Sequence, residues 1–162
     1  MQTIAEINIC NEQNLTDLYR RYVGDYPKFF KMDGLSKLGF VATEMLLKEN
    51  QLKLEENCCI IFGGKQGCIS NDKNFQTTID KNNYFPSPSL FVYTLPNIVT
   101  GLLAIRNKVY GETMFYFLKS EEQLLKLTEL TISKNHCKQA LCGFVDYISE
   151  NNYRAHLILF EN

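Results

Sequence analysis

Ser120 is the first candidate for covalent chemistry in the sequence, because it stands where an apolar segment gives way to a helix-like pattern. A serine or cysteine at a strand-to-helix turn can act as a nucleophile when the helix amides stabilise an anion and a histidine accepts the proton. The available histidines are His136 and His156. Two glutamates follow Ser120 directly, and their negative charge disfavours an alkoxide or oxyanion there. The S-x-x-Q spacing to Gln123 therefore favours a helix cap over a nucleophile.

The cysteines are a second candidate group. Most of them lie inside apolar runs, where a reduced cysteine behaves as a small hydrophobic side chain, so we expect buried thiols. The six are Cys10, Cys58, Cys59, Cys68, Cys137 and Cys142. His136, Cys137 and Cys142 are of zinc-ligand type, but no fourth ligand follows at a spacing such as C-x-x-C. We therefore expect no metal site and no cofactor.

The segment Gly63-Gly64-Lys65-Gln66-Gly67 raises the question of a phosphate-binding loop. Backbone amides at such a turn can hold an anion, but a Walker loop places four residues between its first glycine and Gly-Lys-Ser/Thr. Here the lysine precedes the last glycine. The segment is better interpreted as a strand-to-helix turn that needs a positive φ angle.

Length and composition favour one ordinary globular domain. The 162 residues could bury roughly 70% of the surface of the unfolded chain. With 17 Lys+Arg against 18 Asp+Glu and no basic run, we expect no nucleic-acid binding. No apolar run reaches about 18 residues, and the N-terminus has neither a basic region nor a long apolar region. We therefore expect a cytoplasmic protein without a membrane span.

The hydrophobic pattern predicts alternating strands and helices. Strands are expected at 5–9, 58–62, 114–118, 140–148 and 155–160, with the last two joined as a hairpin. Helices are expected at 15–22, from Asp33 to about Asn50, from Asn97, and from Ser120 through Leu124, Leu127 and Leu130. The helix from Asn97 carries so few polar residues that we expect it to be buried nearly all round, and 114–118 to be a fully buried strand. The order predicts a three-layer α/β domain with a mainly parallel sheet and helices on both faces.

One block of the sequence resembles the N-terminal half of β-ketoacyl synthases. It contains Phe85-Pro86-Ser87-Pro88, then Leu95-Pro96-Asn97 leading into a helix with an internal Gly101, and then Tyr110-Gly111-Glu112-Thr113. Lys31-Met32-Asp33 and the strand and glycine turn at 60–64 agree more weakly. The resemblance extends over 27–160 and is specific only in 86–113. It is similar, within the family, to ketosynthase-like proteins linked to aryl-polyene or flexirubin-type pigments.

The resemblance implies half of a thiolase-like fold, with residues 1–162 as one ketosynthase N-terminal-like domain. The family places its nucleophilic cysteine at or near Ser120, and no cysteine lies between Cys68 and Cys137. The two family histidines belong to a second half that this sequence lacks, and neither His136 nor His156 matches them. A decarboxylating condensation needs both a thiolate and that anion site, so we expect no condensing activity.

These departures lead to three functional hypotheses. The first is a catalytically inactive subunit, similar to a chain-length factor, in a fatty-acid, polyketide or aryl-polyene-type pathway. It implies a homodimer or a heterodimer with a ketosynthase, and an acyl carrier protein as a further partner. In the family the strand before the catalytic cysteine forms the dimer edge, although a central strand of a monomer would show the same apolar pattern; that edge would be Thr113, Met114, Phe115, Tyr116, Phe117 and Leu118.

The other two hypotheses are an enzyme and a binding module. A small acyltransferase or thioesterase would use Ser120 or Cys68 with His136 or His156. A non-catalytic module would bind acyl chains in a groove lined by aromatic side chains, although the sequence favours a place in the core for these residues: Tyr84, Phe85, Phe91 and Tyr93.

Overall fold

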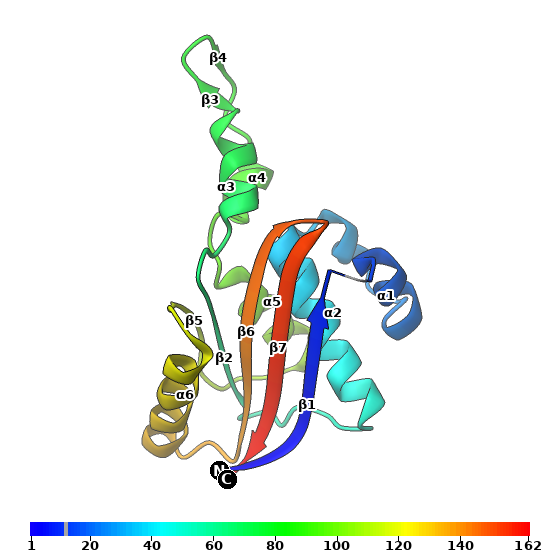
Figure 1. Ribbon diagram of the computed structural model, residues 1–162, viewed down its shortest axis with the longest axis vertical. Coiled ribbons are helices and arrows are strands. Elements are labelled where there is room, and N and C mark those ends of the chain that lie inside the picture. Colours follow the sequence, from blue (N-terminus) through cyan, green and yellow to red (C-terminus); the bar gives the residue numbers. More distant parts are fainter. Residues whose placement is uncertain (12) are drawn as a thin grey trace.

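The computed structural model describes residues 1–11 and 13–162, which form a five-stranded sheet with helices on both faces. The strands of this sheet are β1 (Gln2–Cys10), β2 (Cys59–Gly64), β5 (Thr113–Phe117), β6 (Gln139–Ser149) and β7 (Asn152–Glu161). Their order is β1-β7-β6-β2-β5 (Figure 1). β2 pairs in parallel with β5 and β6, whereas β7 pairs antiparallel with β6 and β1. The sheet is therefore mixed rather than mainly parallel, because the first strand joins the C-terminal hairpin.

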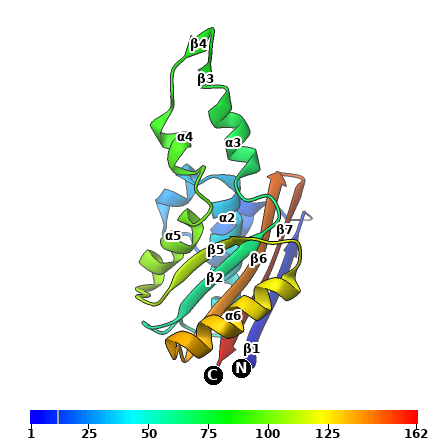
Figure 2. The same cartoon turned by 90° about the vertical axis from the view of Figure 1, so that its left-hand side faces the viewer.

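The helices divide between the two faces of this sheet. They are α1 (Leu15–Tyr22), the short 3-10 helix η1 (Pro27–Lys31), α2 (Gly34–Glu49), α3 (Ile69–Gln76), α4 (Pro88–Val92), α5 (Ile98–Asn107) and α6 (Glu121–Asn135). α2 and α5 pack together on one face, with α1 outside α2. α6 packs on the other face against β2 and β6 (Figure 2). The predicted α/β fold with helices on both faces is confirmed.

Local sequence signals account for most of these elements. Asp33 begins α2, because its carboxylate accepts hydrogen bonds from the amides of Leu35 and Ser36 at 3.3 and 3.1 Å. β2 is buried at every position, as its wholly apolar sequence predicts for a strand covered on both faces. β6 and β7 form the predicted hairpin.

Residues 69–92 form an arm that extends away from the sheet (Figure 1). It contains α3, α4 and a small hairpin of β3 (Ile79–Asp80) and β4 (Asn83–Tyr84). The side chain of Asn71 is 4% exposed and donates a hydrogen bond of 2.8 Å to the carbonyl oxygen of Leu90. This bond ties α3 to α4, so the two helices hold the arm together.

The core consists of two apolar clusters, one on each face of the sheet. Alternation along β2 sends Ile60 and Phe62 into the larger cluster beneath α2 and α5. Cys59 and Ile61 point into the smaller cluster beneath α6. No helix in residues 1–11 and 13–162 is long and apolar enough to cross a membrane.

Two burial predictions are wrong, and both concern the β5 end of the sheet. α5 is not buried all round, because Ile105 is 71% exposed and a Cβ atom added at Gly101 would meet nothing within 4 Å. β5 is not fully buried, because it is an edge strand that exposes Met114 and Phe117. Both elements leave apolar side chains in contact with solvent.

Candidate functional site

Ser120 lies beside the topological switch point of the sheet, where the connections of two neighbouring strands run over opposite faces. The connection from β2 to β5 includes α5 on one face, and the connection from β5 to β6 includes α6 on the other. In open α/β sheets, ligands bind beyond the carboxyl ends of the strands at such a switch point. Cavities of about 450 and 340 Å³ lie there, and Lys65 and Lys119 line both. This is the position at which the fold would hold a catalytic centre.

The glycine-rich turn after β2 belongs to this position. The amides of Lys65 and Gln66 donate hydrogen bonds of 2.7 and 3.3 Å to Oδ1 of Asp146. Gly67 has a φ angle of 52°, which confirms the prediction of a turn with positive φ. The carboxylate of Asp146 therefore already accepts the hydrogen bonds of the backbone amides that a bound phosphate would need.

Ser120 precedes α6 but does not cap it. Its side chain is exposed and accepts no hydrogen bond from the first amides of the helix. Oε1 of Gln123 instead reaches back to the amide of Lys119 at 3.0 Å. The predicted capping role of the serine is therefore wrong. Of the two hydrogen bonds of a capping box, only the one accepted by Gln123 forms, and its donor is the amide of Lys119 rather than that of Ser120.

His156 is held by carboxylates at both ring nitrogens. Nδ1 lies 2.8 Å from Oε2 of Glu121, and Nε2 lies 2.7 Å from Oε1 of Glu6. Arg154 contacts the other oxygen of Glu121 at 2.8 Å. Burial lowers the pKa of His156, but the hydrogen bonds that the ring donates to Glu121 and then to Glu6 outweigh it, so the pKa lies above its ordinary value. An imidazole that donates from both nitrogens has no lone pair left to accept a proton from Ser120.

The other predicted base, His136, is too far from Ser120, and the other predicted nucleophile, Cys68, is buried. His136 lies just beyond the far end of α6, and a 15-residue helix is about 22 Å long, so His136 cannot reach Ser120. Cys68 is 4% exposed, and burial together with nearby acidic groups raises its pKa to about 12. The described residues therefore bring no nucleophile together with a free base.

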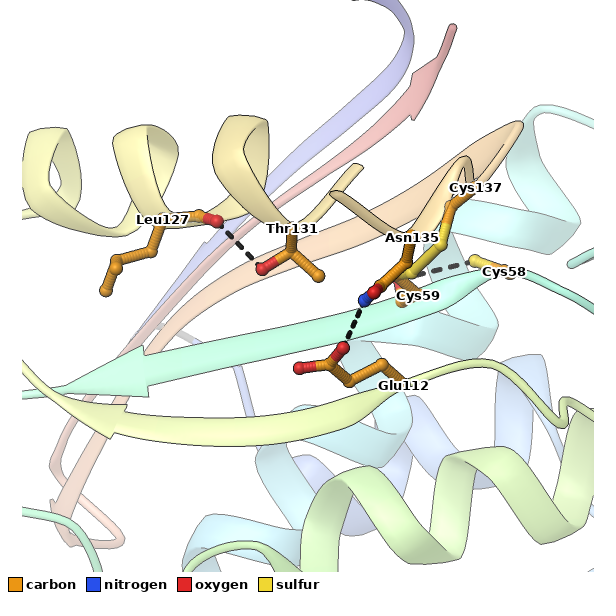
Figure 3. Close-up of a disulfide and its surroundings, with 7 residues drawn as sticks. All are labelled: Cys58, Cys59, Glu112, Leu127, Thr131, Asn135 and Cys137. Atoms are coloured by element: carbon orange, nitrogen blue, oxygen red, sulfur yellow. Dashed lines mark hydrogen bonds between the residues drawn. A yellow bond between two sulfur atoms is a disulfide. The ribbon is translucent and has the colours of Figure 1, made fainter. Parts of the chain in front are cut away.

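Two of the six cysteines form a disulfide that no spacing motif in the sequence predicts. Cys59 joins Cys137 across 78 residues, with a Cα–Cα distance of 6.4 Å (Figure 3). The prediction of buried thiols is wrong for this pair and for Cys10, which is an exposed thiol. It is confirmed for Cys58, Cys68 and Cys142. The described residues contain no group of three side chains that could hold a metal ion.

The segment 113–118, predicted as a dimer edge, forms the outer strand of the sheet and the residue after it. Phe117 is 65% exposed and Met114 38%. Twelve large hydrophobic side chains are exposed among the described residues, and nine of them lie between positions 84 and 117. We call these nine the apolar side: Tyr84, Phe85, Phe91, Val92, Leu95, Ile105, Tyr110, Met114 and Phe117.

The apolar side includes three of the four aromatic residues proposed for an acyl groove. Tyr84, Phe85 and Phe91 are 71%, 82% and 54% exposed, so their interpretation as core residues is wrong. Tyr93 is half-buried and packs against the larger core cluster. An acyl groove at these residues stays a prediction.

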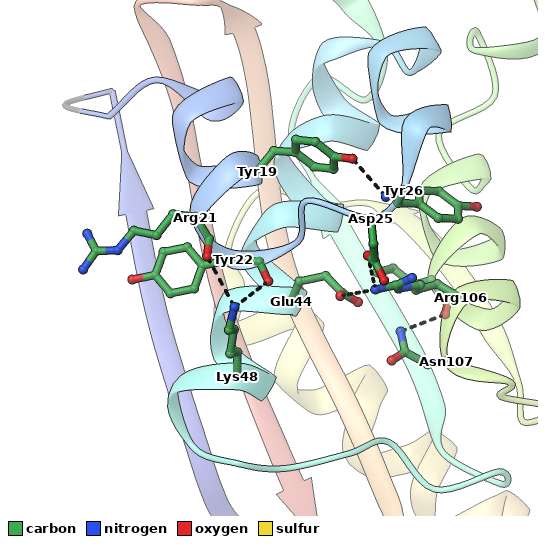
Figure 4. A network of polar contacts seen from close by, with 10 residues as sticks. Tyr19, Arg21, Tyr22, Asp25, Tyr26, Glu44, Lys48, Arg106 and Asn107 are labelled. Carbon is green, nitrogen blue, oxygen red and sulfur yellow. Dashed lines mark hydrogen bonds and ion pairs between the residues drawn. The ribbon is translucent and has the colours of Figure 1, made fainter.

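A second polar network was missed by sequence reasoning. Arg106 on α5 contacts Oδ1 of Asp25 at 2.8 Å and Oε2 of Glu44 at 3.3 Å, and its guanidinium carbon lies 5.5 Å from the ring centre of Tyr26 (Figure 4). The sequence signal for this network was Arg106, the charged residue of the mostly apolar α5. The network joins α5 to α2 and to the connection after α1.

Comparison with known proteins places this geometry in a known fold. No protein-family model matches the sequence, and no curated protein matches it. Solved structures do match. The ishigamide ketosynthase/chain length factor aligns with a TM-score of 0.75 over 88% of this chain at 17% identity. The chain has a ketosynthase-like fold.

Two further ketosynthase structures support this result. The ketosynthase ApeO in complex with its chain length factor ApeC from Xenorhabdus doucetiae aligns with a TM-score of 0.71 over 99% of this chain at 12% identity. The AntDE:AntF complex, a type II PKS acyl-carrier protein with its ketosynthase, also gives 0.71 over 99%, at 16% identity. This chain spans 47% of the ishigamide protein, 79% of the ApeO/ApeC chain and 62% of the AntDE:AntF chain. The predicted ketosynthase-like fold is thereby confirmed, and this chain covers only part of the length of its structural relatives.

Proposed function

We propose that the chain is a non-catalytic, chain-length-factor-like subunit that pairs with a ketosynthase through β5 and the apolar side. An acyl carrier protein that visits the complex is a further partner in this proposal. The fold supports it, because two of the structures described above are of a ketosynthase with, or named together with, a chain length factor.

The observation that carries the proposal is the position of the exposed apolar residues. α4, α5 and the start of β5, which carry four of the nine residues of the apolar side, lie along one side of the molecule (Figure 2). β5 leaves one edge of its backbone unpaired within the described sheet. An edge strand bordered by exposed apolar side chains is typical of a surface that a partner covers.

The outer face of α6 provides the contrast. It carries Glu122, Lys126 and Glu129, and Glu122 and Lys126 form an ion pair at 2.7 Å. Leu130 is the one member of the twelve exposed large hydrophobic residues that belongs to α6. The outer face of α6 is mostly charged and suited to contact with solvent. We therefore place the partner on β5 and the apolar side instead.

The non-catalytic part of the proposal follows from the switch point. The resemblance puts the family's cysteine position at or near Ser120, where the sequence has no cysteine, and both nitrogens of His156 are engaged by carboxylates. Substitution of Ser120 by Ala should leave any activity of the assembled complex unchanged. Loss of activity with the fold and the complex intact would restore the enzyme hypothesis.

Partner binding is tested by matched aspartate substitutions. Phe117→Asp places a charge on the proposed contact surface, and Leu130→Asp places one on α6 at nearly the same exposure, 65% against 66%. The tagged chain is purified from its native source, and the partner ketosynthase is titrated against both variants. Binding should weaken at least about tenfold for Phe117→Asp and stay unchanged for Leu130→Asp. Equal binding of both variants would show that the surface is wrongly assigned.

A further inference from the structure

The Cys59–Cys137 disulfide joins three elements at one corner of the sheet. Cys59 is the first residue of β2, and Cys137 lies in the short connection between α6 and β6. Asn135, the last residue of α6, donates a side-chain hydrogen bond to Glu112, which directly precedes β5 (Figure 3). The start of β2 is therefore linked covalently to the connection after α6, and the end of α6 is hydrogen-bonded to the residue before β5.

Both oxidation states of the pair fit this corner. Cys59 is fully buried and Cys137 is 5% exposed, and both belong to the apolar cluster beneath α6 together with Ile61, Leu124 and Ile132. A thiol packs in such a cluster as a small hydrophobic group. Reduction of the bridge therefore leaves no strongly polar group without a partner.

The remaining cysteines indicate that the bridge is not a permanent structural bond. Cys10 is an exposed thiol, and three more thiols are buried. A chain that keeps four of six cysteines as thiols, one of them exposed, is typical of a reducing compartment, where a disulfide is transient or redox-sensing. Burial raises the pKa of Cys58 to about 12 and of Cys142 to about 11, so these two neighbours stay unreactive thiols.

We propose that Cys59 and Cys137 form a reversible redox pair whose co-reactant is a small-molecule disulfide of the glutathione class. The thiolate of Cys137 attacks the small disulfide RS–SR, which gives a Cys137–S–S–R bond and releases RS⁻. The thiolate of Cys59 then attacks the sulfur of Cys137 and releases the second RS⁻. The protein gives up two electrons and two protons, and the small disulfide becomes two thiols. The inference holds whether or not the chain binds a ketosynthase.

The structure also assigns the order of the two steps. Cys137 lies between the exposed residues His136 and Lys138, in the connection of residues 136–138. Cys137 is 5% exposed in this connection, whereas Cys59 is fully buried within β2. Cys137 is therefore the first residue to react, and Cys59 resolves the mixed disulfide.

The test counts thiols by alkylation and intact mass. A Cys10→Ser background removes the exposed thiol, which would otherwise form its own mixed disulfide. The folded protein is equilibrated with oxidised or reduced glutathione, unfolded and alkylated. We expect three labels after oxidation and five after reduction, and full interconversion between the two. Five labels under both conditions, or three labels that persist after reduction of the folded protein, would overturn the proposal.

Two variants separate the proposed pair from other thiols. Cys142→Ser removes a thiol of the same apolar cluster and should keep the difference of two labels. Cys137→Ser should abolish the difference, since Cys59 then has no partner. A difference of two labels that survives in Cys137→Ser would assign the redox pair to other residues. Oxidation should also raise the melting temperature by about 5–15 °C, because the bridge closes a long loop, and this rise should be absent in Cys137→Ser.

Discussion

The imidazole of His156 on β7 lies 2.7 Å from the carboxylate of Glu6 on β1, although 150 residues separate them in the sequence. On its other side it lies 2.8 Å from Glu121, the first residue of α6. This one side chain therefore joins an edge strand, its neighbour in the sheet and the helix that begins beside Ser120.

This arrangement predicts that stability falls as the pH rises above about 6.5. The folded pKa of His156 is raised, so its contribution is fully present below the ordinary histidine pKa of about 6.5 and is lost as the pH rises through the higher folded value. His156→Gln should cost about 1–2 kcal/mol at pH 6 and should flatten the pH dependence above 6.5. The check is chemical denaturation from pH 6 to 9. His136→Gln is the matched control and should leave the slope in place; a wild-type slope in His156→Gln would contradict this account.

Arg106 is expected to contribute more to stability than an exposed arginine. Its side chain is 26% exposed and faces Glu44, which is 12% exposed, so Arg106→Ala leaves a partly buried carboxylate without its cation. The free energy of unfolding should fall by about 2–3 kcal/mol. Arg20→Ala breaks an ion pair whose members are 70% and 72% exposed and should cost less than about 0.5 kcal/mol. Equal losses in urea titrations of the two variants would show that the network adds nothing beyond surface charge.

Alanine substitution should raise the stability of the protein at Gly101 and lower it at Gly111. A Cβ at Gly101 meets nothing within 4 Å in the middle of α5, so Gly101→Ala should stabilise the protein by about 0.5–1 kcal/mol. A Cβ at Gly111 would lie 2.1 Å from the carbonyl oxygen of Cys58, so the backbone would have to move. Gly111→Ala should therefore cost more than about 2 kcal/mol. Thermal unfolding of both variants checks the pair, and a destabilised Gly101→Ala would mean that this face of α5 is covered.

Ser120→Ala should have almost no effect on stability. Its side chain accepts no hydrogen bond from α6, whereas Oδ1 of Asn14 accepts the amides of Thr16 and Asp17 at 2.9 and 3.3 Å. We expect a change within about 0.5 kcal/mol for Ser120→Ala and a loss of about 1 kcal/mol for Asn14→Ala. A loss of 1 kcal/mol for Ser120→Ala in the same denaturation experiment would restore the capping prediction.

The sequence was sufficient for the elements whose signal is local. The unbroken apolar run before Gly63 predicted a strand covered on both faces, and Asp33 before an apolar stripe predicted the start of α2. The quoted block at 85–113 was sufficient for the ketosynthase-like fold.

The features that the sequence did not predict depend on contacts between segments far apart in the chain. No local pattern of residues encodes such contacts. β1 pairs antiparallel with β7 from the other end of the chain, which turns a mainly parallel sheet into a mixed one. Cys59 and Cys137 meet across 78 residues without a spacing motif. The apolar run at 114–118 could not distinguish an edge strand from a central one, because both are rich in the same side chains.

The most direct test of the proposed function is the stoichiometry of the chain purified from its native source. We would combine a tagged pull-down with light scattering, for the wild type and for Phe117→Asp and Leu130→Asp. The account predicts a one-to-one complex with a ketosynthase that is lost in Phe117→Asp and retained in Leu130→Asp. A wild-type chain that scatters as an 18.8 kDa monomer with no ketosynthase bound would contradict it.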